Sequence, residues 1–85
     1  MKTSQQELPV TPYPLNHFPS GSKVAVTNLA GGRGARSRLY ALGFTPGTEI
    51  LIVSGGLGPL RLKIRGSDLS LGQGLAEKVI ATRVE

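Results

Sequence analysis

The sequence contains no cysteine and no tryptophan, and its aromatic residues are limited to two tyrosines and two phenylalanines among 85 residues. The absence of cysteine excludes disulfide bonds, thiolate metal sites, cysteine nucleophiles and thiol redox switching. The shortage of rings predicts an aliphatic core and leaves little surface on which nucleic-acid bases could stack. A cysteine-free chain suits a cytoplasmic location, which we therefore expect.

Long hydrophobic runs are also missing. No segment approaches the roughly 20 consecutive apolar residues that a membrane-spanning helix needs. No apolar run precedes Pro9, so we expect no secretory signal peptide. We therefore expect a soluble protein that does not insert into a membrane but can still bind a membrane protein.

Histidine and acidic residues are scarce, which bears on metal binding and catalysis. His17 is the single histidine and has no acidic residue near it in the sequence, while Glu49, Asp68 and Glu77 lie far apart. A site for a divalent transition metal in a cysteine-free chain needs imidazole and carboxylate ligands around one point, and nucleophilic or acid–base catalysis needs a positioned base. The sequence therefore predicts no metal site, no cofactor and no catalytic residue, and we expect a protein that is not an enzyme.

The chain has the length of a single domain and carries more positive than negative charge. Ten lysines and arginines stand against five acidic residues, which gives a formal net charge of +5. This balance favours an acidic protein, a nucleic acid or an anionic membrane surface as partner, although it also serves solubility alone. A chain this short has only a modest core, so we expect no large catalytic cleft.

The first 14 residues are predicted to form a flexible proline-rich arm, because Pro9, Pro12 and Pro14 disfavour both helix and central strand. The spacing from Pro9 to Pro12 is a minimal P-x-x-P pattern, which is weak evidence for a polyproline II ligand. We place the folded domain at residues 15–85.

Residues 33–53 are predicted to form a helix, a stop, a tight turn and a strand. Apolar residues recur at helical spacing from Ala35 up to a glycine, which ends the helix because glycine takes positive φ without steric cost. A proline–glycine pair then favours a turn, and the aliphatic residues 48–53 predict the strand that follows it. This motif consists of Leu39, Leu42, Gly43, Pro46 and Gly47.

Four more segments have strand patterns, namely 23–29, 60–65, 69–71 and 78–84. Residues 72–77 are predicted as a single helical turn. Five short strands with glycine-rich turns favour a small SH3-like antiparallel barrel, with one short helix inserted after the first strand and a helical turn before the last. An OB-type barrel is the alternative.

Exposed candidates for binding occur on the helix, on two strands and in a loop. Arg36 and Tyr40 share one helix face. The strand at 48–53 is apolar on both faces, so it is either covered on both sides or carries an exposed apolar strip. A leucine at a glycine-rich loop tip either anchors a partner or folds over the barrel end. The partner-binding candidates are Arg36, Tyr40, Leu51, Val53, Leu57, Arg61, Lys63 and Arg65, of which the last three form a predicted line of cations.

The order of these motifs resembles a known family. The run from Arg38 to Ile50, RLYALGFTPGTEI, is followed by Gly58-Pro59 before a basic strand, by Gly66, and by Ala76 before the closing strand. In this order and spacing, residues 15–84 resemble FeoA, the small cytosolic ferrous iron transport protein A. No single element is diagnostic, so the resemblance rests on their combination.

The resemblance implies an SH3-like barrel with an accessory role in bacterial ferrous iron uptake. It implies binding to FeoB, a membrane permease with a cytosolic GTP-binding domain, and modulation of that protein by contact rather than by chemistry. Self-association is a further possible interaction, because the predicted strands leave open edges. The alternative is a basic barrel that binds RNA or single-stranded DNA through its phosphates, in a strongly salt-dependent way. We expect no stable nucleic-acid complex, because stacking rings are few.

Overall fold

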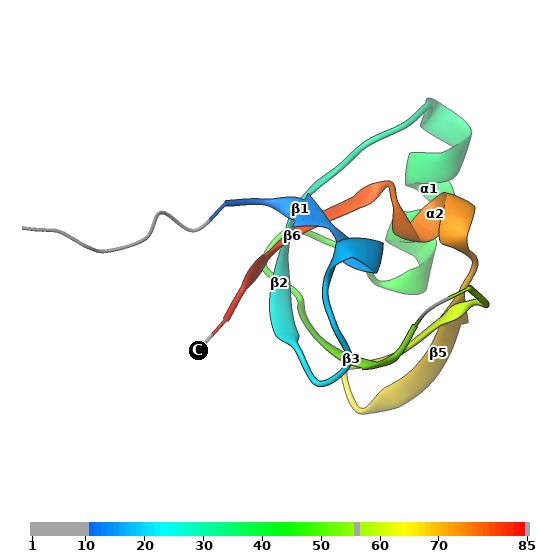
Figure 1. Cartoon of the computed structure of the whole chain (residues 1–85). Coiled ribbons are helices and arrows are strands. Elements are labelled where there is room, and N and C mark those ends of the chain that lie inside the picture. The colour runs from blue at the N-terminus through cyan, green and yellow to red at the C-terminus, as the bar shows by residue number, and fades with distance from the viewer. Residues whose placement is uncertain (1–10, 56, 85) are drawn as a thin grey trace, which may run out of the picture.

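The computed structural model describes residues 11–55 and 57–84, which form one curled antiparallel sheet with the strand order β1-β6-β2-β3-β4-β5 (Figure 1). The strands are β1 Tyr13–Pro14, β2 Lys23–Leu29, β3 Glu49–Ser54, β4 Leu60–Ile64, β5 Ser67–Leu71 and β6 Val79–Arg83. The helices are the 3-10 helix η1 Leu15–His17, α1 Arg33–Leu42 and α2 Gln73–Ala76. The predicted β-rich barrel, with α1 after the first long strand and a helical turn before the last, is confirmed.

The core lies inside the curl of the sheet and is aliphatic, as the composition predicts. Strand β4 shows the cause most simply, because its alternate residues Leu60, Leu62 and Ile64 are buried while Arg61 and Lys63 are exposed. The same alternation in β2 and β3 supplies the opposing walls of the core. The outward residues of these strands therefore form a continuous outer face.

Helix α1 ends as the sequence predicts. Gly43 has φ 103°, and its N–H group donates to the carbonyl groups of Leu39 and Tyr40. The N–H group of Phe44 donates to Leu39 at 3.0 Å, which folds the chain back against the last helical turn. Phe44 is fully buried as a result, whereas Leu42 is 41% exposed. Leu42 therefore follows the apolar spacing of the helix without belonging to the core.

The turn after α1 has the predicted chemistry. The N–H group of Thr48 donates to the carbonyl of Thr45 at 3.0 Å, and Gly47 adopts φ 90° as the third residue of this four-residue turn. The N–H group of Gly47 also donates to Val26 at 2.7 Å. The turn thus joins α1 to β3 and is fixed against β2.

The sheet has six strands rather than the predicted five. Tyr13 and Pro14 lie in the segment that we expected to be an arm, yet they pair with Ala81 and Ile80 of β6. Proline is tolerated here because β1 is an edge strand, where one side of the ladder needs no donor. Residues 1–10, which include Pro9 of the P-x-x-P pattern and most of the predicted arm, lie outside the described residues.

Arg65 does not continue the line of cations on β4. It has φ 53° and Gly66 has φ 80°, and together they form the two-residue turn between the last paired residues, Ile64 and Ser67. Positive φ at both positions is the signature of a type I′ hairpin turn. Strand β5 accordingly begins at Ser67, two residues earlier than we predicted.

Candidate partner-binding face

An apolar strip flanked by lysines lies on the outside of the sheet. Leu51 is 37% exposed and Val53 is 44% exposed, so the outward side of β3 is not covered. In the ladder, Leu51 pairs with Lys23 of β2 on one side and with Lys63 of β4 on the other. Adjacent strands lie about 4.8 Å apart, so the two lysine backbones straddle Leu51 at roughly 10 Å from each other.

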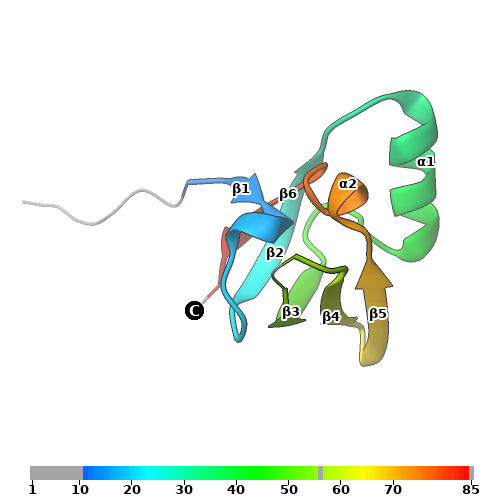
Figure 2. The same cartoon turned by 45° about the vertical axis from the view of Figure 1, so that its right-hand side comes forward.

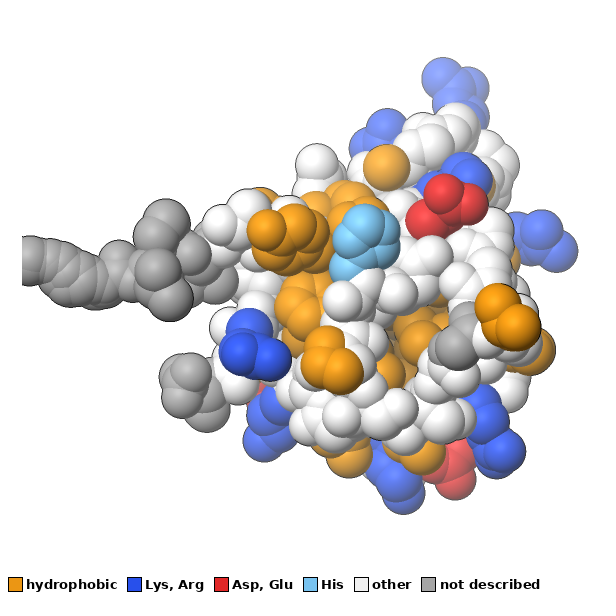
Figure 3. All heavy atoms as spheres, in the orientation of Figure 1, with side chains coloured by type: hydrophobic (Ala, Val, Ile, Leu, Met, Phe, Trp, Pro, Cys, Tyr) orange, Lys and Arg blue, Asp and Glu red, His pale blue; other side chains and the backbone are white. Residues whose placement is uncertain are grey.

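A β-bulge continues this surface towards the next loop. The pairing of β3 with β4 shifts between Ile52 and Ser54, which leaves Val53 at the irregularity and sets Arg61 opposite Ser54. We call Lys23, Leu51, Val53, Arg61 and Lys63 the outer β face. In Figure 3, hydrophobic and basic side chains are interspersed along the lower edge of the molecule, where Figure 1 shows β3 and β5.

Acidic residues border the outer β face without neutralising it. The ammonium group of Lys63 lies 3.5 Å from a carboxylate oxygen of Asp68, and both side chains are more than half exposed. Such an exposed ion pair contributes little to stability, because water screens the attraction between its charges. Glu49 lies at the start of β3, opposite Ala25. The cations beside Leu51 and Val53 therefore remain available to a partner.

Leu57 lies at the tip of the loop between β3 and β4 and is fully exposed. The sequence left open whether this leucine folds over the barrel end, and the structure shows that it does not. Gln73 of α2 donates from Nε2 to the carbonyl of Gly58 at 2.8 Å and accepts from Asn16 Nδ2 at 3.0 Å. These two hydrogen bonds attach the loop beside Leu57 to η1 and α2.

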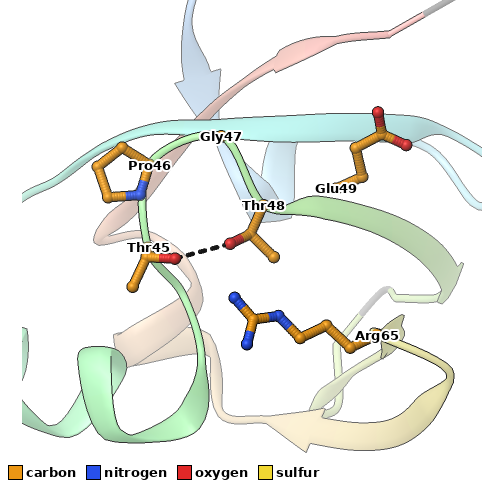
Figure 4. Close-up of a pocket in the computed structure, with 6 residues that line it drawn as sticks. All are labelled: Thr45, Pro46, Gly47, Thr48, Glu49 and Arg65. Carbon is orange, nitrogen blue, oxygen red and sulfur yellow. Dashed lines mark hydrogen bonds between the residues drawn. The ribbon is translucent and has the colours of Figure 1, made fainter.

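Arg65 lies apart from the outer β face. It lines a shallow groove with the turn after α1 and with Glu49. Figure 4 shows its guanidinium group pointing towards Thr45 and Thr48, whose hydroxyl oxygens are 2.8 Å apart. The structure thus separates Arg65 from Arg61 and Lys63.

The helix candidates form a second surface. Arg36 and Tyr40 line a concavity with Arg33, Ser37 and Gly32. In Figure 2, α1 lies at the right of the molecule, above the end of β5 and well to one side of β3. The eight predicted binding residues therefore fall on the outer β face with its loop tip, on α1, and at the β4–β5 turn.

The rings near β1 and η1 form one small cluster, and no metal-binding site is assembled in the part of the chain that the structure describes. No three histidine, aspartate or glutamate side chains gather there in a metal-binding group. His17 stacks against Tyr13, with ring centroids 6.2 Å apart. The two exposed tyrosines, Tyr13 and Tyr40, lie on different elements. Phe18 also packs edge-on against Tyr13, with ring centroids 6.4 Å apart, so the rings of this cluster contact one another. One small cluster with Tyr40 apart from it does not favour nucleic-acid binding, which stacks successive bases on a series of rings.

Sequence reasoning missed two residues of these surfaces. The alternating pattern marks Lys23 as the start of a strand, and that alternation already places it on the outward side. Its position beside Leu51 depends on the register between β2 and β3, which no local pattern encodes. The other missed residue is Arg33, which begins the predicted helix but is not among the predicted binding candidates, although it lines the concavity on α1. None of the helices among residues 11–55 and 57–84 is long and apolar enough to cross a membrane.

The curled six-stranded sheet, closed by short helices and open on its outer β face, defines a small SH3-like domain. The sequence pattern of the FeoA domain matches residues 13–83. The chain therefore belongs to the FeoA family.

Individual relatives agree with this assignment. A protein of Methanocaldococcus jannaschii, provisionally named Fe(2+) transport protein A, is 32% identical over 73 residues, which cover 86% of this chain and 89% of that protein. The crystal structure of an iron uptake regulatory protein, FeoA, is similar with a TM-score of 0.81 and 32% identity, and the match covers 88% of this chain and all of the other.

The fold recurs in a more distant relative. FeoA of Stenotrophomonas maltophilia, crystallised with zinc and described as an SH3 domain protein, has a TM-score of 0.70 and 23% identity over 80% of this chain and 87% of its own. At this identity the likeness concerns the fold alone.

Proposed function

We propose that this chain is a non-enzymatic accessory protein of ferrous iron uptake that binds a FeoB-type permease from the cytosolic side through its outer β face. The observation that carries the proposal is the exposed pair Leu51 and Val53 on β3. Leu51 lies between Lys23 of β2 and Lys63 of β4, and Leu57 is a further exposed aliphatic residue. Membership of the FeoA family supplies the transport context. Contact with the permease would modulate transport or GTP hydrolysis there.

The chemistry of the outer β face suits a protein partner. Burying one leucine side chain contributes about 1.5–3 kcal/mol, so three exposed aliphatic side chains provide the apolar centre of an interface. Cations at the rim add steering and specificity more than affinity. Arg61 and Lys63 lie on one side of the apolar strip and Lys23 on the other, which is the arrangement of an apolar centre with a charged rim.

Leu57 has a defined role in this proposal. No described residue covers its side chain, so a partner that contacts it can remove the whole apolar surface of this leucine from water. The hydrogen bonds of Gln73 hold the loop beside it, which lowers the entropy lost when the loop is immobilised on binding.

The experiment is a binding titration of the full chain against the purified cytosolic part of FeoB and against full-length FeoB, each with and without guanine nucleotide. The test variants are Leu51→Ser and Leu57→Ser, and the matched control is Leu42→Ser, because Leu42 has nearly the same exposed fraction as Leu51 but lies on α1. We expect Kd to rise by about tenfold or more for each test variant, which corresponds to about 1.4 kcal/mol, and to change little for the control.

The proposal fails if the wild-type chain binds neither form of FeoB, or if Leu42→Ser weakens binding as much as Leu51→Ser does. Thermal unfolding of every variant, compared with the wild type, is the control for an intact fold. A titration with mixed-sequence RNA at two salt concentrations tests the nucleic-acid alternative, since phosphate binding loses affinity steeply as salt rises.

A further inference from the structure

We propose that α1 carries a second docking surface, separate from the outer β face, that binds an acidic segment of a protein partner. The surface consists of Arg33, Arg36, Ser37 and Tyr40, which together with Gly32 line one concavity on the exposed side of the helix. This inference does not depend on FeoB being the partner of the outer β face.

The charge of α1 favours an acidic partner. The ten residues of α1 include three arginines, at positions 33, 36 and 38, and no acidic residue. Within the described residues, none of these arginine side chains has a hydrogen bond or an ion pair. The charged residues after α2 do not change this balance, because Glu77 and Lys78 are neighbours in the sequence and carry opposite charges. The face is therefore cationic, and its guanidinium groups remain available.

Helix α1 also lacks the usual stabilising features of a short helix. Its first turn contains Arg33 rather than an acid, although the helix dipole favours negative charge there. Gly32 provides no side-chain cap, and Gly34 lies inside the first turn. Residues that destabilise their own helix are expected where the surface of that helix serves binding. A partner carboxylate beside Arg33 would offset the first of these costs.

Most of the circumference of α1 is exposed. Leu39 is its buried residue, and the structure describes all ten of its residues. Tyr40 is 45% exposed and adds a hydroxyl group beside Arg36, one helical turn away. In Figure 2, α1 stands at the upper right of the sheet, beyond the end of β5 and to one side of β3. A partner can therefore reach it while the outer β face is occupied.

The chemistry favours carboxylates of a protein over the phosphates of a nucleic acid or a lipid. Guanidinium groups bind carboxylates and phosphates alike in a bidentate way, and Ser37 and Tyr40 add hydroxyl donors in the same concavity, so the choice between the two anions depends on what carries them. A single exposed ring on α1 offers no stacking platform for bases. A flat lipid surface would not enter a concavity, whereas an acidic side chain can. The occupant that fits is thus a peptide segment rich in aspartate or glutamate.

The test is a titration of the full-length ¹⁵N-labelled chain with a synthetic twelve-residue peptide of alternating glutamate and alanine. The chemical shifts of the backbone amides are measured at each step and give both the binding site and Kd. We expect shifts clustered at residues 31–40, and Kd to rise about tenfold in Arg36→Glu and in Arg33→Glu. The matched control is Arg83→Glu, which makes the same charge change at an exposed position on β6 and should leave Kd within about twofold.

Three results would overturn the inference. One is the absence of peptide binding at low salt. Another is a loss of affinity in Arg83→Glu equal to that in Arg36→Glu, because binding would then follow net charge alone. The third is tighter binding through the same α1 residues to mixed-sequence RNA or to vesicles of phosphatidylcholine and phosphatidylglycerol. Tyr40→Phe, which removes only the hydroxyl group, should weaken peptide binding by less than Arg36→Glu.

Discussion

Replacing Gly43 by alanine should destabilise the whole domain, because this residue ends α1 in a left-handed conformation that a side chain disfavours. Its φ is 103°, where a Cβ atom crowds the following carbonyl oxygen at a cost of about 1–2 kcal/mol. An alanine Cβ would lie 3.6 Å from Ile64 Cδ1, which is ordinary contact. The expected loss is therefore conformational and not a clash with the core.

The size of this effect is measurable in so small a protein. A domain of 60–100 residues loses about 4–8 °C of Tm for each kcal/mol. The assay is thermal and urea unfolding followed by far-UV circular dichroism, with ΔG compared at a common temperature. Gly34→Ala is the matched control, since Gly34 lies inside α1 and an alanine Cβ there would meet no atom within 4 Å. This control should stabilise the helix by about 0.5–1 kcal/mol. Equal stability of Gly43→Ala and the wild type would refute the argument.

Three further substitutions test separate parts of the structure. Phe44→Ala should cost about 3–5 kcal/mol because the ring is fully buried, which a lowered urea midpoint would show. Arg65→Asn should be neutral or stabilising by up to about 1 kcal/mol, since asparagine tolerates positive φ better than arginine, and a clear drop in Tm would contradict the turn assignment. Gln73→Leu should leave the fold intact but speed hydrogen exchange at residues 57 and 58, because the bond to Gly58 is lost. Unchanged exchange there would show that the loop is held by other contacts.

Local sequence patterns predicted the elements whose conformation depends mainly on the residues within them. Alternation in residues 60–64 indicates both the strand and its buried side, because side chains of a strand alternate between faces. Gly43 and Gly47 indicate the helix end and the turn, because both positions require positive φ. These features depend on a few neighbours in the sequence, so they can be predicted without knowledge of the tertiary structure.

Tertiary contacts decided the features that sequence reasoning missed. The exposure of Leu42 depends on where the chain folds back after α1, and Phe44 takes the core position there. The strand at Tyr13 and Pro14 exists because β6 offers a partner, although proline is a poor strand former by itself. Arg65 continues an alternating pattern in the sequence, but the two-residue turn removes it from the strand.

The composition of the candidate binding face was predicted better than its arrangement. The sequence identified Leu51, Val53, Arg61 and Lys63 as candidates, and the register of the sheet then placed them side by side. The same register added Lys23, which sequence spacing could not associate with residues nearly 30 positions away.

The most direct test of the central claim is to map the amide signals of the ¹⁵N-labelled chain that shift or broaden when the cytosolic part of FeoB is added. We expect changes on β3, on β4, at Lys23 and around Leu57, with no comparable change at the β1 edge of the sheet. Changes confined to α1, or no change at protein concentrations where both partners remain folded, would contradict the assignment of the outer β face as the surface that binds FeoB.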